Sequence, residues 1–182
     1  MANITLAVTG SISAYKAADL TSQLTKLGHK VTVLMSRSAM DFITPLTLQS
    51  LSKNLVHTEV MVEEDPSLIK HIDIAKETDL FLVAPASANT IAKLAHGMAD
   101  NIVTATALAL PIGIPKLIAP AMNTNMYLNP ATQKNLNTLE EYGFDEVKPR
   151  EALLACGDFG TGALAEVTDI LEKVSNTLNE NK

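Results

Sequence analysis

Aromatic residues and cysteine are scarce in this sequence of 182 residues. Phe, Trp and Tyr make up 4% of the chain, there is no Trp, and Cys156 is the single cysteine. One cysteine excludes a disulfide within the chain, and no Cys or His cluster has the spacing of a metal site. With an apolar fraction of 47%, the core must consist of Ala, Val, Ile and Leu, which is typical of layered α/β proteins.

Basic charge and long apolar runs are scarce as well. The formal net charge is −6 at pH 7, which argues against nucleic acid, because phosphate backbones require clustered Lys and Arg. The longest apolar stretch, residues 105–114, is interrupted by Pro111 and Gly113 and is too short to span a membrane. The amino terminus also lacks the pattern of a secretory signal. We therefore expect a cytoplasmic, single-domain protein that binds neither nucleic acid nor membrane.

Apolar runs alternate with helical segments along the chain. Strands are predicted at residues 4–9, 30–35, 80–84, 116–119 and 144–147. Helices are predicted at residues 13–27, 100–110, 130–142 and 167–178, the first with Ser13 as its N-cap, and another opens after residues 85–90. Residues 68–76 fit a helix or a strand, and residues 39–66, which end in an irregular stretch, give the weakest pattern. The order predicts a single-domain Rossmann-like (flavodoxin-like) α/β fold, an open parallel sheet with helices on both faces.

Residues 119–127 form a polar, helix-poor segment directly after a predicted strand, and they contain two Asn, two Met and a Tyr. Open α/β sheets bind ligands outside the carboxyl ends of their strands, so this segment is a candidate binding loop. Pro120 lacks the N–H that a strand ladder needs, and Pro85 lacks it at the end of the preceding predicted strand. Both strands are therefore predicted to stop at these prolines. An ordinary strand-to-helix connection explains the segment equally well.

Two predicted strand-to-helix turns suit an anion. Gly10 allows close approach of a ligand to the backbone, and the free N–H groups of the helix start, with Ser11 and Ser13, supply donors. The turn is not GxGxxG, which favours a mononucleotide over a dinucleotide. Residues 85–90 form a second such turn, although plain N-capping needs only one of their polar side chains.

A glycine-rich segment follows the only cysteine. Three of the eight glycines lie within residues 157–162. A buried structural cysteine would normally lie in a strand or helix, so Cys156 on this segment predicts a mobile flap at residues 151–166 that bends over a site. His71 lies at the margin of an apolar face, where a lone histidine is more often structural than catalytic unless a motif assigns it a role.

Three ordered motifs resemble the homo-oligomeric flavin-containing cysteine decarboxylases. They are residues 85–90 (PASANT), residues 120–123 (PAMN) followed by Met126 and Tyr127, and residues 155–158 (ACGD). The similarity extends from about residue 8 to residue 166. It implies FMN as cofactor, one flavoprotein decarboxylase domain over residues 1–182 without a ligase domain, and a trimer or a dodecamer of trimers. A separate phosphopantothenate–cysteine ligase would then supply the substrate.

The resemblance also implies roles for individual residues. It implies FMN binding by Gly10, Ser11, Ile12, Ser36, Ser38, Ser87, Ala88, Asn89, Thr90 and Ala121. It implies catalysis by His71 as base, Cys156 as proton donor and Asn123, and substrate binding by Asn123, Met126 and Lys76, the last near the substrate phosphate. No role is assigned to Thr161, Ala163 and Leu164, where some relatives have Pro, Arg and Met.

The implied activity is FMN-dependent decarboxylation of 4′-phosphopantothenoylcysteine to 4′-phosphopantetheine in coenzyme A biosynthesis. A cysteine amide lacks an electron sink for loss of CO2, and oxidation of its thiol to a thioaldehyde, assisted by His71, supplies one. Cys156 then protonates the enethiolate carbon, and the hydride returns from the flavin. The alternatives are oxidative decarboxylation of a peptide's carboxy-terminal cysteine, which does not need Cys156, and a non-catalytic flavin-binding regulatory protein.

Overall fold

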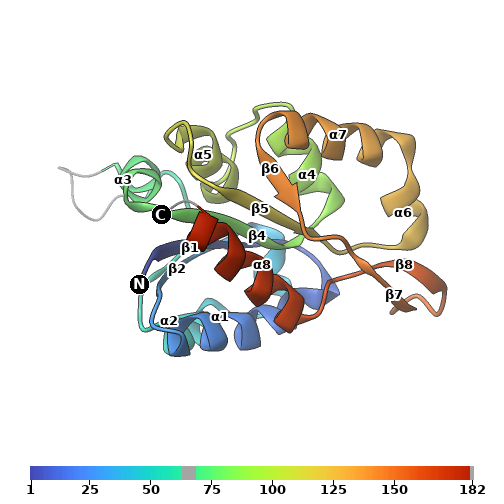
Figure 1. Cartoon of the computed structure of the whole chain (residues 1–182), viewed down its shortest axis with the longest axis horizontal. Coiled ribbons are helices and arrows are strands. Elements are labelled where there is room, and N and C mark those ends of the chain that lie inside the picture. Colours follow the sequence, from blue (N-terminus) through green and yellow to red (C-terminus); the bar gives the residue numbers. More distant parts are fainter. Residues whose placement is uncertain (63–68, 181–182) are drawn as a thin grey trace.

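Six parallel strands form one sheet in the order β3-β2-β1-β4-β5-β6 (Figure 1). The strands are β1 (Asn3–Val8), β2 (Lys30–Met35), β3 (Val56–His57), β4 (Leu80–Ala86), β5 (Lys116–Pro120) and β6 (Phe144–Glu146). The computed structural model describes residues 1–62 and 69–180, so the end of the predicted irregular stretch and Leu68 lie outside the described residues. The predicted open parallel sheet is confirmed.

Helices cover both faces of this sheet. They are α1 (Lys16–Lys26), α2 (Pro45–Ser52), α3 (Lys70–Glu77), α4 (Ala88–Ala95), α5 (Ile102–Ala109), α6 (Thr124–Leu128), α7 (Pro130–Glu141) and α8 (Val167–Glu180). Figure 1 shows α1, α2 and α8 on one side of the sheet and α3, α4, α5 and α7 on the other. Within the described ranges, no helix is long and apolar enough to cross a membrane.

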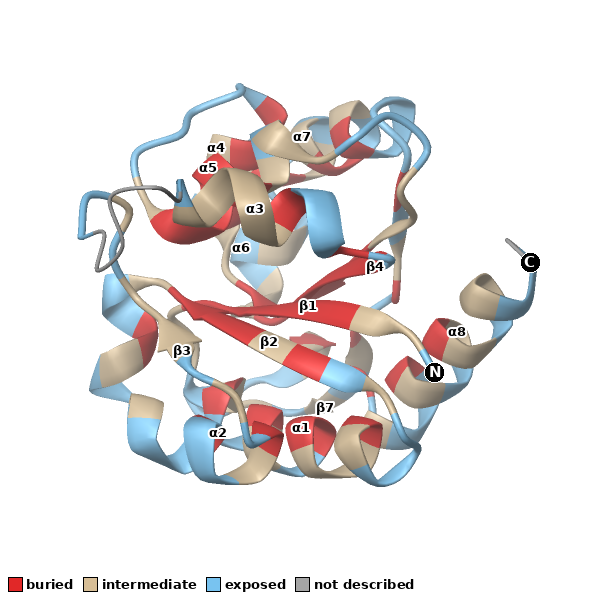
Figure 2. Cartoon of the chain, turned by 90° about the vertical axis from the view of Figure 1, so that its left-hand side faces the viewer, coloured by how far each residue is buried: buried red, intermediate tan, exposed pale blue. Residues whose placement is uncertain are grey.

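Alternation of side chains along the strands builds two cores. Ile4, Leu6 and Val8 of β1 are buried in the core that contains the apolar residues of α1 and α8, whereas Ala7 belongs to the core on the opposite face with Phe81. Figure 2 shows buried stretches along β1, β2 and β4, between the helices. The sheet is therefore covered on both faces, as its nearly continuous apolar strands require.

Several predicted boundaries were wrong for identifiable reasons. A 3₁₀ turn (Ile12–Tyr15) precedes α1, and its N-cap is Ser11 rather than Ser13. Neither predicted proline stop occurs at the proline: β4 continues past Pro85 to Ala86, and β5 includes Pro120, which pairs with Ala86. The register of the two strands is irregular just before this pair, which accommodates residues that lack an N–H.

Four elements were not predicted: β3, α6 and both strands of a hairpin. The edge strand β3 has two residues, too few to give a pattern of alternation. The segment predicted to be helix-poor contains α6, whose N-cap is Asn123. The predicted flap is an antiparallel hairpin of β7 (Arg150–Leu153) and β8 (Phe159–Ala163), separate from the main sheet. The ambiguous run before β4 forms the helix α3.

Candidate active site

A cavity of about 420 Å³ lies where β1, β4 and β5 end and where the hairpin β7–β8 begins. Its volume is in the range of small-molecule sites. Among its lining residues are Gly10, Ser11, Ile12, Ser87, Ala88, Ala121, Asn123, Met126 and Cys156, all predicted site residues. A larger hollow of about 930 Å³ beside α4 and α5 has a mainly apolar lining that includes none of the predicted site residues, so we assign the site to the smaller cavity.

The first turn of the cavity follows β1. Ser11 Oγ accepts a hydrogen bond from the backbone N–H of Ser13 at 3.3 Å. A Cβ placed on Gly10 would lie 2.4 Å from Ser38 Oγ, so only glycine allows the serine segment after β2 to pack this closely. Ser36 Oγ lies 3.2 Å from Ser38 Oγ. Ser36 and Ser38 therefore adjoin this turn, although they are not among the residues that line the cavity.

The second turn follows β4 and opens α4. Ser87 Oγ accepts from the N–H of Thr90 at 3.3 Å and its hydroxyl donates to Thr90 Oγ1 at 3.2 Å. Thr9 Oγ1 accepts from the N–H of Ser87 at 2.8 Å, which fixes this turn against the end of β1. Ser87 thus serves as the N-cap, while Thr90 is buried behind it and Asn89 is exposed. Asn89 and Thr90 are not among the residues that line the cavity.

Asn123 and Cys156, which both line the cavity, form a triangle of polar atoms with Asp158. Asn123 Nδ2 donates to Cys156 Sγ at 3.3 Å and to Asp158 Oδ2 at 3.5 Å. The Cys156 thiol donates to the same carboxylate oxygen at 3.4 Å. Asn123 Oδ1 accepts from the backbone N–H of Asn125 at 2.8 Å, so the oxygen of this amide caps α6 and the nitrogen faces the thiol.

The hairpin packs closely on the loop that carries Asn123. The N–H of Met122 donates to the carbonyl oxygen of Gly162 at 2.9 Å. A Cβ on Gly162 would lie 2.2 Å from the oxygen of Met122, and a Cβ on Gly160 would lie 2.6 Å from Thr124 Oγ1. These two glycines therefore allow the hairpin and the loop to pack in contact. The sequence predicted only that the glycines would let a flap bend.

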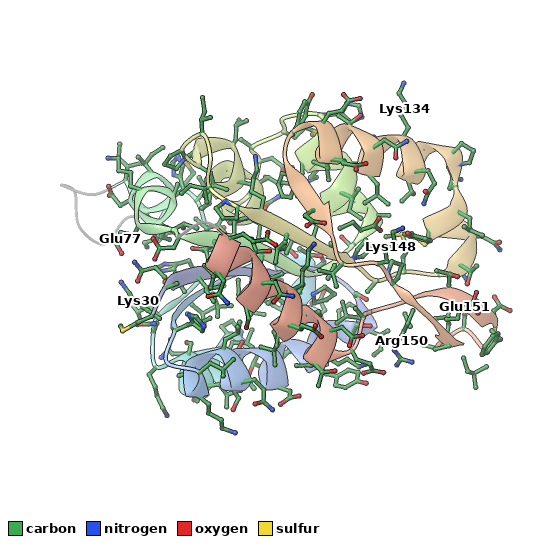
Figure 3. The ribbon with its side chains drawn as sticks, viewed as in Figure 1. Lys30, Glu77, Lys134, Lys148, Arg150 and Glu151 are labelled. Atoms are coloured by element: carbon green, nitrogen blue, oxygen red, sulfur yellow. The ribbon has the colours of Figure 1, made fainter. Side chains whose placement is uncertain are left out.

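Two cations in the cavity wall were missed by the sequence analysis. Lys16 and Arg150 line the cavity, and both pair with Glu166, at 3.5 Å from Lys16 Nζ and at 2.9 Å from Arg150 Nε. Lys16 follows the Gly10 turn by less than two helical turns, so its closeness in the sequence could have predicted its place at the cavity. Nothing in the sequence placed Arg150 beside it. Figure 3 shows Arg150 and Glu151 on the hairpin, at the opposite end of the molecule from Lys30 and Glu77.

His71 and Lys76 lie on α3, away from this cavity. Helix α3 packs on α5, and Figure 1 places it at the opposite end of the molecule from the hairpin. Lys76 is exposed and pairs with Asp73 at 3.6 Å. His71 is half-buried, and its Nδ1 is buried with no hydrogen-bond partner among the described residues. One protomer therefore does not bring His71 to Cys156.

A half-buried pair fixes α6 from the other side. The hydroxyl of Tyr127 donates to Glu146 Oε1 at 3.0 Å, joining α6 to the end of β6. Burial and the neighbouring carboxylate raise the pKa of Tyr127 to about 12, and burial raises the pKa of Glu146 as well. Gln133 of α7 donates to the backbone oxygen of Tyr127 at 2.7 Å. The helix that begins at Asn123 is thus attached to both neighbouring elements.

Metal-binding geometry is not found at this site or elsewhere in the described part of the chain. No group of three or more His, Cys, Asp or Glu side chains there could hold a metal ion.

The sequence matches the model of a protein family described as Flavoprotein over residues 1–179. It is 61% identical over 175 residues to "Probable phosphopantothenoylcysteine decarboxylase" of Streptococcus mutans, covering 96% of this chain and 98% of that protein. It is 46% identical over 170 residues to "Coenzyme A biosynthesis bifunctional protein CoaBC" of Bacillus subtilis, covering 93% of this chain. The chain spans only 41% of the length of that second relative.

Solved structures show the same fold. A cysteine-to-serine mutant of PPC decarboxylase complexed with pantothenoylaminoethenethiol superimposes with a TM-score of 0.88 at 32% identity, covering 98% of both chains. The FMN-dependent cysteine decarboxylase SpaF superimposes with a TM-score of 0.86 at 27% identity, covering 99% of this chain and 97% of that chain. The similarity thus includes the whole sheet and the hairpin that carries Cys156.

Proposed function

Because this chain belongs to the Flavoprotein family, we propose that it binds FMN and decarboxylates 4′-phosphopantothenoylcysteine to 4′-phosphopantetheine in coenzyme A biosynthesis. The reaction would make the protein a carboxy-lyase, and we expect it to take place in the cytoplasm. The observation that carries the proposal is the 3.3 Å contact between Asn123 Nδ2 and Cys156 Sγ in a cavity at the carboxyl ends of the strands. It places an amide and an acidic proton beside one another where open α/β sheets bind ligands.

The residues of the cavity fit FMN. The turn after β1 offers backbone N–H groups and the hydroxyls of Ser11 and Ser13, which suit a phosphate, and Lys16 adds a positive charge. The side chains of Ile12 and Met126 are about half exposed and give the same cavity an apolar surface for a ring system. We propose that Gly10, Ser11, Ile12, Ser87, Ala88 and Ala121 contact the cofactor, with Ser36, Ser38, Asn89 and Thr90 around them. When bound, FMN supplies the two-electron acceptor that converts the substrate thiol to a thioaldehyde and afterwards returns the electrons.

The side chains of this chain then hold the substrate and move protons. We propose that Asn123 and Met126 orient the cysteine moiety, since an amide both donates and accepts hydrogen bonds. Cys156 would act as the general acid that protonates the carbon left by CO2, because cysteine thiols are mostly protonated near neutral pH. In the similar PPC decarboxylase structure, a cysteine-to-serine mutant is complexed with pantothenoylaminoethenethiol, an unsaturated thiol. Such a compound is expected where the protonation step fails.

A homo-oligomer reconciles this site with the position of α3. His71, the proposed base, and Lys76, proposed to bind the substrate phosphate, both lie on α3, at the other end of the protomer from Cys156 (Figure 1). A site that uses all three requires α3 of a second copy beside the hairpin of the first. We therefore propose that the site lies between two copies and, as the resemblance to the homo-oligomeric cysteine decarboxylases implies, that the copies form a trimer or a dodecamer of trimers.

Mass spectrometry of the reaction tests the proposal. The purified protein, loaded with FMN, is incubated with 4′-phosphopantothenoylcysteine or with a peptide ending in cysteine, and the products are compared. We expect loss of CO2 from the first substrate with a saturated thiol as product, and accumulation of the unsaturated enethiol with the Cys156→Ser variant. Turnover of the peptide alone would favour the peptidyl-cysteine activity of relatives such as SpaF. Absence of CO2 from the flavin-loaded protein with either substrate would exclude a decarboxylase.

A further inference from the structure

We infer that Asp158 is a positioning residue for Cys156: its carboxylate keeps this cysteine in the S–H form and directs the proton that the thiol delivers. The delivery step rests on the function proposed above. The effect on the thiol itself is a property of the protein without substrate, so the two parts can be tested separately.

The contact is built into the turn of the hairpin. The Cys156 thiol donates to Asp158 Oδ2 at 3.4 Å, two residues away. The turn that spans both residues is closed by backbone hydrogen bonds from Leu154 N to Asp158 O at 2.8 Å and from Gly157 N to Leu154 O at 2.9 Å. The carboxylate is therefore held beside the sulfur by the backbone, not by a free side-chain rotation alone.

Asp158 and Asn123 act on the sulfur in opposite directions. A carboxylate that accepts the S–H bond favours the neutral thiol, since a thiolate at the same place would be repelled. An amide N–H that donates to sulfur favours the thiolate, and Asn123 Nδ2 does so at 3.3 Å. When the S–H bond breaks and the new C–H bond forms, the amide stabilises the thiolate that remains. The carboxylate then favours its reprotonation by water, which restores the acid for the next turnover.

The other charged groups near the cavity have different partners. Lys16 and Arg150 line the cavity and are both paired with Glu166. On α6 the titratable group is Tyr127, whose hydroxyl donates to Glu146. On the hairpin, Glu151 accepts from the hydroxyl of Thr161 at 3.4 Å. In the described part of the chain, Asp158 is thus the carboxylate for which a contact with the thiol is found.

The single cysteine makes the test specific, because alkylation by iodoacetamide reports on one thiol only. The thiolate is the form that reacts. In Asp158→Asn we expect alkylation at pH 7 to be about threefold faster than in the unmodified protein, since the loss of one exposed, solvent-screened charge beside a thiol has an effect of that order. Glu151→Gln removes a charge from the same hairpin away from the sulfur, and its rate should be unchanged. Equal rates for Asp158→Asn and the unmodified protein at every pH would overturn the inference.

A second measurement separates this inference from the proposed function. The circular dichroism spectra and urea midpoints of Asp158→Asn and Asp158→Ser are each compared with those of the unmodified protein. If Asp158→Asn is misfolded, Asp158→Ser replaces it in both measurements. If the protein decarboxylates its substrate, Asp158→Asn should release more unsaturated enethiol per CO2 than the unmodified protein, whereas Asp158→Asn/Cys156→Ser should release CO2 at the same rate as Cys156→Ser alone. Slower CO2 release by the double variant than by Cys156→Ser would show that Asp158 does not act through Cys156. Faster alkylation without any decarboxylation would refute the proposed function and leave the Asp158 contact intact.

Discussion

The backbone N–H of Met122 donates to the carbonyl oxygen of Gly162 at 2.9 Å, and this bond joins the loop after β5 to the hairpin. The two segments are forty residues apart in the chain and carry Asn123 and Cys156, so this backbone contact brings the proposed substrate-orienting amide to the proposed acid. The hairpin is anchored at β8, and the turn with Cys156 extends from that anchor.

Replacing Gly162 with Ala should break this anchor. The added Cβ would lie 2.2 Å from the oxygen of Met122, and the φ of +153° suits glycine, so the loop or the hairpin must move. We expect a loss of about 1–3 kcal/mol in the free energy of unfolding, measured with urea, together with slower decarboxylation. Gly157→Ala is the control on the same hairpin, because a Cβ there has no atom within 4 Å and only its φ of +91° is unfavourable. A Gly162→Ala protein as stable and active as the original would contradict the tight contact.

Asn123 has two functions that substitutions can separate. Its Oδ1 caps α6 by accepting from Asn125, and its Nδ2 contacts Cys156. Asn123→Asp keeps the cap but turns a carboxylate oxygen toward Asp158 Oδ2 in place of the N–H that lies 3.5 Å from it. Because this contact is exposed, we expect a loss of at most about 1 kcal/mol in the free energy of unfolding, whereas turnover should fall by about 100-fold because the N–H donor is lost. Asn123→Ala should lose turnover and also about 1 kcal/mol of stability.

The matched control for Asn123 lies one helix further along. Asn129 Oδ1 caps α7 by accepting from Ala131 at 2.9 Å, and the residue is not part of the cavity wall. Asn129→Ala should cost about 1 kcal/mol of stability without changing turnover. If it slowed turnover as much as Asn123→Asp does, capping rather than the Asn123 N–H would explain the loss.

The sheet could be predicted from the sequence because its central strands are apolar on both faces and therefore form clear runs. The Gly10 turn and the loop at Asn123 could be placed for the same reason, since each follows such a run. Strand β3 and hairpin β7–β8 were missed, because β3 has two residues and because β8 alternates glycine with side chains that are not buried, so it shows no buried stripe. Backbone proximity, such as that of Gly162 to Met122, leaves no pattern in a single sequence.

The site residues that directly follow a predicted strand could be placed from the sequence, whereas those positioned by contacts between distant segments could not. Those at strand ends, such as Ser87 and Ala121, line the cavity as the resemblance implied. Arg150 was missed because its position beside Lys16 and Glu166 depends on how the hairpin folds back. His71 and Lys76 lie elsewhere in the protomer, and their roles stay predictions because a role at this site would require a second copy of the chain.

The Tyr127–Glu146 pair should make stability depend on pH above the ordinary tyrosine range. The pKa of Tyr127 is raised to about 12 in the folded protein, so its contribution is complete below its ordinary pKa of about 10 and is lost as the pH rises through 12. Tyr127→Phe should cost about 1 kcal/mol at pH 8, because Glu146 loses its donor, and the gap to the original protein should narrow between pH 10 and 12. Urea unfolding at pH 8 and pH 11 measures both. Tyr142→Phe, at an exposed tyrosine, is the control, and a gap that does not vary with pH would argue against the raised pKa.

Mixed oligomers test whether His71 and Cys156 of one site come from two copies. His71→Asn and Cys156→Ser are each expected to be inactive in forming the saturated product, and in either oligomer every site lacks one of the two groups. If the two variants are co-expressed, each site between copies draws His71 from one copy and Cys156 from the other, so some sites receive both intact groups. Recovery of about a quarter of the activity is expected for random mixing at each interface, where half of the copies supply each intact group and the two probabilities multiply.

The double variant His71→Asn/Cys156→Ser, co-expressed with the unmodified protein, gives the same result for a site between copies but half of the activity for a site within one copy. Because α3 and the hairpin lie at opposite ends of the protomer, we expect a quarter in both mixtures. No recovery in the first mixture would mean that His71 takes no part in the Cys156 site of another copy.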